Sequence, residues 1–83
     1  MESALIALGE RIRELRQKHH WSQEEFADRC GLHRTAIGLL ERAERNPRLD
    51  TLLTVSNGLG ITVSDLLRDV ERRSQAVAKR GRV

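Results

Sequence analysis

Apolar residues recur along most of this chain at the three- and four-residue intervals of amphipathic helices. Residues 3–19 show the longest such stripe, with charged residues between the apolar positions, and they predict one helix. The alternation typical of strands is missing, so the expected fold class is all-α. The further predicted helices cover residues 23–30, 34–42, 50–59 and a segment that opens at Thr62 and Asp65 and continues through Leu66, Leu67 and Val70.

After Arg73 the helical pattern ends, and the remaining residues are mostly small or basic. We therefore expect a compact five-helix domain over residues 1–71 and a basic C-terminal tail over residues 72–83. The domain holds ten Lys or Arg against twelve Asp or Glu, whereas the tail holds five Lys or Arg and no acid. A domain that binds a polyanion would have to concentrate its positive charge locally, and the residues that could do so are Arg34, Arg42, Arg45 and Arg48.

The start of the second predicted helix is marked by three agreeing features. Ser22 can cap the helix, and Glu25, three residues later, completes a capping box. Trp21 and Phe26 occupy the two positions of a hydrophobic staple on either side of this cap. The chain is therefore expected to enter a helix at residue 23.

Residues 22–41 have the pattern of two short helices that cross at a tight turn. Gly31 follows the first of them, where the chain must turn with positive φ, and the small Ala27 stands where the two backbones come closest. This is the pattern of a DNA-binding helix-turn-helix. The apolar residues expected on the inner faces of the two helices are Phe26, Cys30, Leu32, Ile37 and Leu40.

In such a motif the second helix, residues 33–42 here, enters the major groove, where base edges distinguish all four base pairs. Arg34 can bond guanine O6 and N7 together, and Thr35 offers a hydroxyl and a methyl group. Leu39 can contact a thymine methyl, while Gly38 would let the helix approach the bases closely. His33, Arg45 and Asn46 flank this helix and are expected to contact backbone phosphates.

Six runs, in this order and spacing, resemble the Cro and phage-repressor type (XRE-like) helix-turn-helix family over residues 9–67. The resemblance implies five short helices, a bacterial or phage origin, sequence-specific binding of double-stranded DNA and a homodimer. The matching runs are Gly9-Glu-Arg-Ile-Arg-Glu-Leu-Arg16, Ser22-Gln-Glu-Glu-Phe-Ala27, Gly31-Leu-His-Arg-Thr35, Leu40-Glu-Arg42, Arg45-Asn-Pro47 and Leu59-Gly-Ile61.

The same resemblance implies further roles for individual residues. Gln23 stands at the family position whose side chain and amide meet a phosphate at the start of a helix. Arg48 follows Pro47, where some relatives insert an arginine into the minor groove. Glu41 corresponds to a glutamate that accepts hydrogen bonds from an arginine of the first helix, which implies a partly buried ion pair between Arg16 and Glu41.

Four residues depart from the family pattern. Ala43 replaces the usual glycine, so either the third helix ends differently or Ala43 accepts the left-handed conformation at a cost of roughly 1 kcal/mol. Ser56 replaces a core alanine, and Gly58 lies late in a helix. His33 is a weak cap, which leaves the first amides of its helix available to a phosphate.

Dimerisation is expected through the last predicted helix, because this segment has more apolar surface than its own core needs. Two-fold pairing would suit a pseudo-palindromic operator with half-sites about 34 to 36 Å apart. The alternatives are that the stripe packs on the first helix, or that the protein is an interaction module of an antitoxin or antirepressor type. In that second case the tail would be a docking segment. A further alternative is that the tail binds DNA or RNA without sequence preference. The residues of the expected dimer interface are Ile61, Val63, Leu66, Leu67 and Val70.

Other classes of function find no support in the sequence. There is no Gly-rich phosphate loop and no nucleophile–base pair, so we expect neither an enzyme nor a cofactor or small-molecule ligand. His19, His20, His33 and Cys30 lack the spacing that preorganises a metal site. A single cysteine suits a reducing compartment, and no apolar run approaches the roughly 20 residues of a membrane span. We expect a cytoplasmic protein, associated with the nucleoid in a bacterium.

Overall fold

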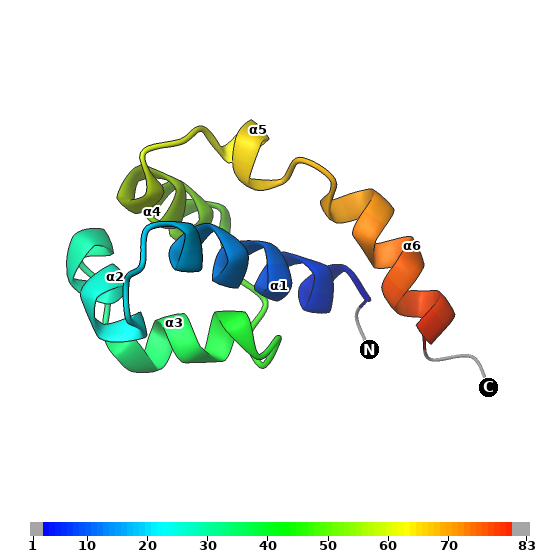
Figure 1. The fold of residues 1–83 in the computed structure, drawn as a ribbon, viewed down its shortest axis with the longest axis horizontal. Coiled ribbons are helices and arrows are strands. Elements are labelled where there is room, and N and C mark those ends of the chain that lie inside the picture. The colour runs from blue at the N-terminus through cyan, green and yellow to red at the C-terminus, as the bar shows by residue number, and fades with distance from the viewer. Residues whose placement is uncertain (1–2, 81–83) are drawn as a thin grey trace.

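The chain folds into helices joined by short turns, as the sequence predicts (Figure 1). The computed structural model describes residues 3–80, and no strand occurs among them. None of the helices in this range has the length and apolar composition needed to span a bilayer. The all-α prediction is confirmed. The helices are α1 (Ser3–Lys18), α2 (Gln23–Cys30), α3 (Arg34–Glu41), α4 (Leu49–Leu59), α5 (Val63–Leu66) and α6 (Val70–Arg80).

The hydrophobic core is built by the first five helices together. Each of them contributes at least one large apolar side chain with no exposed surface, so none of the five is peripheral to the core. Burial of a side chain of this size stabilises the fold by roughly 1.5–3 kcal/mol relative to its exposure. Helices as short as α2 and α3 have little stability alone, and this shared core supplies it. The five side chains are Ile12, Phe26, Ile37, Val55 and Leu66.

Several helices end in a residue with positive φ, which turns the chain back toward the core. Gly31 (φ 70°) ends α2, and its amide and that of Leu32 bond Asp28 and Ala27 carbonyls in the Schellman arrangement. Ala43 (φ 60°) takes the same position after α3, where its amide and that of Glu44 bond Leu40 and Leu39 carbonyls. Of the two alternatives for Ala43, the structure therefore shows the left-handed one.

The last predicted helix is divided in the structure, so the expectation of one helix through Val70 is wrong. α5 ends at Leu66, and Asp69 adopts a φ of 67° before α6 begins at Val70. Arg11 of α1 donates hydrogen bonds to the carbonyl oxygens of Asp65 and Leu66, at 2.7 and 3.2 Å. These carbonyls thereby find a partner outside the helix, and aspartate tolerates the left-handed conformation well.

The expectation that the helical pattern ends after Arg73 is also wrong, because α6 continues to Arg80 and packs along α1 (Figure 1). Its register is set by the buried Val77 and by two ion pairs with α1. Both oxygens of Glu14 lie 2.7 Å from the guanidinium of Arg73, and Arg80 lies 2.9 Å from Glu10. The acidic residues that neutralise this basic segment lie far away in the sequence, in α1. The composition of residues 72–83 alone therefore suggested a separate basic tail. Residues 81–83 lie outside the described residues.

The structure accounts for two departures from the family pattern in α4, one at its contact with α2 and one within the helix. A Cβ atom at Gly58 would collide with the sulfur of Cys30, so glycine is needed for this approach. Ser56 is buried, but its hydroxyl donates a hydrogen bond to the carbonyl of Leu53 at 3.0 Å. The buried hydroxyl is therefore satisfied within α4.

Candidate nucleic-acid interface

The start of α2 has the capping geometry that the sequence predicts. The Ser22 hydroxyl accepts a hydrogen bond from the Glu25 amide at 3.0 Å, and the Glu25 carboxylate accepts one from the Ser22 amide at 2.9 Å. The rings of Trp21 and Phe26 pack with their centroids 6.0 Å apart. The capping box is confirmed, and it sets the direction in which α2 leaves the turn.

The first turn of α3 presents polar side chains to solvent while its other face is buried. Arg34 and Thr35 are exposed, whereas Ile37 and Leu40 belong to the core. His33 caps the helix in extended conformation without a side-chain hydrogen bond, so the first amides of α3 are not occupied by their own cap. Two residues of the type that contacts base edges thus stand at the end of α3 that carries a positive partial charge.

Further along α3 the surface differs from the expectation that Gly38 lets the helix approach the bases closely. Gly38 is buried, because the guanidinium of Arg42 lies over it: an added Cβ would come 2.8 Å from Arg42 Nη1. Arg42 follows Gly38 by one helical turn, which brings its long side chain over this position. Leu39 is half-buried. The exposed group at this point of the helix is therefore Arg42 rather than the backbone of Gly38.

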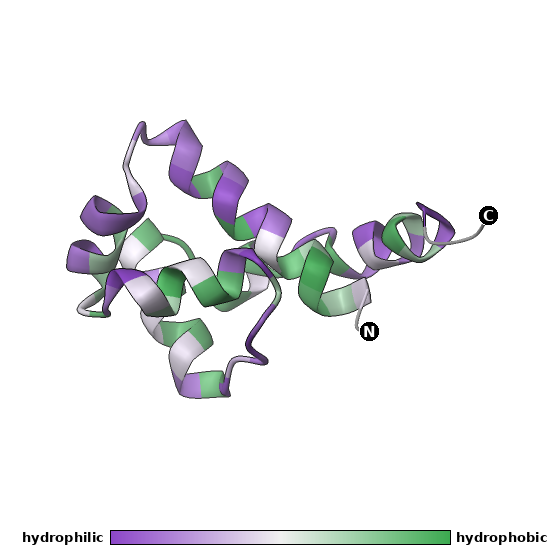
Figure 2. Cartoon of the chain, turned by 90° about the horizontal axis from the view of Figure 1, so that it is seen from below, coloured by the Kyte–Doolittle hydropathy of each residue, from purple (hydrophilic) through white to green (hydrophobic). Residues whose placement is uncertain are grey.

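Figure 2 shows the face of the molecule that carries α3, with α1 along one side of the helix and the loop before α4 along the other. This loop, residues 42–48, is hydrophilic, and its Arg45, Asn46 and Arg48 are exposed. Arg48 lies 3.9 Å from Asp50, but its side chain is 87% exposed, so the pair holds it weakly. We call residues 42–48 the loop flank of α3.

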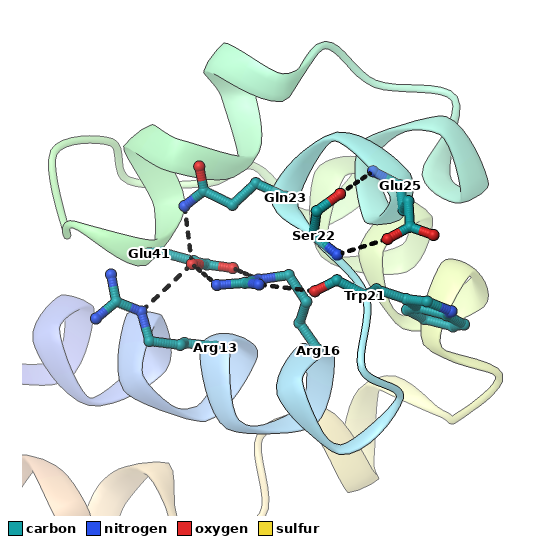
Figure 3. A network of polar contacts seen from close by, with 7 residues as sticks. All are labelled: Arg13, Arg16, Trp21, Ser22, Gln23, Glu25 and Glu41. Carbon is teal, nitrogen blue, oxygen red and sulfur yellow. Dashed lines mark hydrogen bonds and ion pairs between the residues drawn. The ribbon is translucent and has the colours of Figure 1, made fainter.

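On the opposite side, a buried carboxylate joins the first three helices (Figure 3). Glu41 has no exposed side-chain surface, and its two oxygens accept four hydrogen bonds. Arg16 donates two of them, at 2.7 and 3.0 Å, so the structure contains the ion pair that the family resemblance implied. Gln23 Nε2 donates at 3.0 Å and Arg13 Nε at 3.4 Å, both to Oε1. We call Arg13, Arg16 and Gln23 the α1 flank of α3.

The electrostatics of Glu41 follow from these contacts. Burial by itself would raise the pKa of its carboxyl group, but the hydrogen bonds from Arg16 and Gln23 outweigh burial and hold the pKa below its usual value. Glu41 is therefore ionised at neutral pH. Since Arg16 also donates to the carbonyl of Trp21 at 2.8 Å, the α1–α2 turn is tied to the end of α3.

Sequence reasoning named Arg42 only as a source of local positive charge, and it missed the roles of Arg13 and Arg11. Arg42 covers Gly38, Arg13 shares the carboxylate of Glu41, and Arg11 binds the end of α5. For Arg13 a signal was available, because its spacing of three residues from Arg16 places both on one side of a helix. The partners of Arg11 are backbone carbonyls of a distant segment, which no sequence pattern identifies.

The expected dimer surface is only partly exposed. Leu66 is fully buried in the core, which contradicts its assignment to an interface, and Ile61 and Val70 pack against the same core. Val63 is half-buried, while Leu67 is 38% exposed. The most exposed large apolar side chains among residues 3–80 are instead Leu49 and Leu53 of α4, at 67% and 49%.

The crossing of α2 and α3, the exposed polar first turn of α3 and its flanks define this chain as a helix-turn-helix DNA-binding protein. The family model named HTH_3, helix-turn-helix, matches residues 12–66. The chain therefore belongs to the helix-turn-helix family of transcription regulators.

Individual relatives agree with this membership. The chain is 41% identical over 63 residues to the control protein C.BamHI of Bacillus amyloliquefaciens, covering 75% of this chain and 78% of that protein. It is 45% identical over 60 residues to the control protein C.SmaI of Serratia marcescens, covering 72% and 71%.

Solved structures share the fold. The restriction-modification controller protein C.AhdI from Aeromonas hydrophila superposes with a TM-score of 0.72 at 39% identity, covering 75% of this chain and 94% of that chain. The clp gene regulator ClgR from Corynebacterium glutamicum gives a TM-score of 0.82 over 93% of this chain and 82% of that chain. At 23% identity, ClgR is similar in fold alone.

Proposed function

We propose that this protein regulates transcription by inserting α3 into the major groove of double-stranded DNA at specific sequences. The observation that carries the proposal is the exposure of Arg34 and Thr35 on the first turn of a helix whose opposite face is locked into the core. A rigid helix can hold such side chains against base edges, and each good bidentate pair discriminates by about 1–3 kcal/mol.

Along α3 the proposed base contacts are assigned by chemistry and exposure. Arg34 bonds the O6 and N7 atoms of a guanine, and Thr35 contacts the neighbouring base with its hydroxyl or methyl group. Leu39 makes an apolar contact with a thymine methyl. At Gly38 the exposed side chain is that of Arg42, and we assign the contact at this point to Arg42.

Backbone contacts are assigned to both sides of the groove. On the loop flank Arg45, Asn46 and Arg48 contact phosphates, and Arg48 is long and exposed enough to enter the minor groove. His33 contacts a phosphate at the start of α3. Gln23 contacts the opposite strand; its Nε2 donates one hydrogen to Glu41, which leaves the second for a phosphate oxygen.

Among the regulators of this family we assign the protein to the restriction-modification controllers. C.BamHI and C.SmaI are named control proteins, and the similarity extends over more than two thirds of each. C.AhdI, which is named a restriction-modification controller protein, is 39% identical to this chain. These relatives support a controller over a phage repressor or an antitoxin-type regulator. We assign no catalytic activity to the chain, in keeping with a family of regulators.

Selection of bound sites from random DNA, followed by Arg34→Ala, tests the proposed base contact. We expect the wild-type protein to enrich one sequence. The variant should bind it about 10- to 100-fold more weakly, with a relaxed preference at one base pair of each half-site. Specific binding should also survive an excess of random DNA, which binding through α6 alone would not. Uniform weakening at all positions would show instead that Arg34 contacts a phosphate.

We further propose that the protein binds its operator as a homodimer. The exposed Leu49, Leu53 and Leu67 offer apolar surface to a second copy, and a two-fold pair would match a pseudo-palindromic site. Sedimentation at micromolar concentration should give the mass of a dimer, and Leu53→Glu should shift it toward the monomer. A monomer mass up to high micromolar concentration would contradict the dimer.

A further inference from the structure

Arg13 differs from its neighbour Arg16 in how it uses its guanidinium group. Both contact Glu41, but Arg13 does so only through Nε, at 3.4 Å, and its side chain is 52% exposed against 11% for Arg16. Figure 3 shows the two terminal amino groups of Arg13 turned away from the carboxylate. Within residues 3–80 the hydrogen bond of Arg13 comes from Nε, so both terminal amino groups can bind a further acceptor.

The charges of this cluster do not cancel. Two arginines share one carboxylate, and the buried Arg16 donates a short hydrogen bond to each of its two oxygens. One positive charge remains, and it resides on the exposed Arg13. An exposed cation whose internal partner is already shared is suited to an anion from outside the molecule.

A second donor lies beside it. Gln23 Nε2 donates to the same oxygen of Glu41, at 3.0 Å, so one atom orients side chains from both α1 and α2. Figure 3 shows Gln23 and Arg13 on two sides of this oxygen, next to α3. The loop flank, which holds the exposed Arg45 and Arg48, lies on the other side of α3 (Figure 2).

We propose that Arg13 binds a phosphate of the DNA backbone together with Gln23, on the strand that borders the α1 flank of α3. This inference rests on the proposed function, and the new assignment is Arg13. The terminal amino groups of an arginine match two phosphate oxygens. Glu41 is then a positioning residue, because it holds both donors without touching the DNA. Such a contact fixes the register of α3 in the groove and carries no sequence information of its own.

The test compares Arg13→Gln with Arg72→Gln, which removes the same charge from an exposed arginine of α6 paired with Asp69. Affinity is measured for the selected operator and for a random-sequence duplex over a range of salt concentrations. We expect Arg13→Gln to weaken both complexes by about tenfold. The slope of log affinity against log salt should become shallower by about 0.9, as for the loss of one phosphate contact. Arg72→Gln should change neither affinity nor slope.

Further variants separate a phosphate contact from other roles. Arg13→Lys keeps the charge, so it should restore most of the salt slope. Both glutamine variants should melt close to the wild type, because a half-exposed pair contributes less than about 1 kcal/mol. The proposal is overturned if Arg13→Gln binds DNA as tightly as Arg72→Gln does, or if it relaxes the preference at one base pair. It is also overturned if Arg13→Gln melts far below Arg72→Gln. Failure of the proposed function would appear separately, as wild-type protein that enriches no sequence.

Discussion

Replacement of Glu41 by glutamine is expected to lower the free energy of unfolding by about 3 kcal/mol, a large share of the stability of a domain of this size. The substitution keeps the shape of the side chain but removes its charge, so the guanidinium of Arg16 loses its counter-ion in a buried site. An amide oxygen also accepts fewer of the hydrogen bonds that the carboxylate now accepts from α1 and α2. Urea unfolding at neutral pH measures the effect as a lower midpoint.

The pH dependence of stability gives a second readout of the same residue. Because the folded-state pKa of Glu41 lies below its usual value near 4.5, its stabilising contribution is complete above about that pH. The contribution is lost as the pH falls through the folded-state pKa. The variant should therefore lose less stability than the wild type on acidification. Part of the loss will persist, because Arg80 and Arg73 likewise lower the pKa of Glu10 and Glu14.

Glu44→Gln is the matched control, since Glu44 also pairs with an arginine, Arg42, at 3.2 Å, but half of each side chain is exposed. We expect this variant to lose less than about 1 kcal/mol, as exposed pairs do. Equal unfolding midpoints for the two glutamine variants would show that the buried pair is not what ties α3 to α1.

The second large effect is expected from Gly9→Ala. Gly9 lies inside α1 where this helix crosses the end of α3, and an added Cβ would come 2.6 Å from the carbonyl oxygen of Glu41 and 2.7 Å from that of Leu40. Both atoms belong to the backbone, so neither can rotate away. We expect a loss of about 2 kcal/mol, the usual size of overpacking, despite the better helix propensity of alanine.

Gly38→Ala makes the same substitution in another helix and serves as its control. The added Cβ would meet only the mobile end of the Arg42 side chain, so the gain in helix propensity should raise stability by up to about 1 kcal/mol. Thermal unfolding of both variants is the measurement. If Gly9→Ala were as stable as Gly38→Ala, the close approach of α1 and α3 would not limit the packing of this domain.

Much of the helix-turn-helix could be predicted because its determinants are local. The capping box of Ser22 and Glu25, the left-handed turn at Gly31 and the inward spacing of Ile37 and Leu40 depend on residues within one or two helical turns. Such features do not require knowledge of the rest of the fold. The boundaries of α2 and the start of α3 were accordingly predicted to the residue.

Predictions were wrong where the decisive partner is distant in sequence. Residues 70–80 pack on α1 through the buried Val77 and through the pairs of Arg80 and Arg73 with Glu10 and Glu14, which lie far away in the sequence. Leu66 was assigned to a dimer surface because the sequence cannot say which side of a short apolar segment faces its own core. Gly38 was predicted to lie exposed on the face of the helix that approaches DNA, because the sequence does not show that the Arg42 side chain covers it.

By itself, then, the sequence determined the all-α class, the crossing of two short helices and the membership of this chain in its family, since periodicity, caps and turns act over a few residues. Only the tertiary structure decided that α6 lies on α1, that Glu41 joins three helices, and that Arg13 keeps an exposed charge. The physical reason is that charge balance and burial depend on which segments meet in space. In this protein those contacts determine which arginines remain available to DNA.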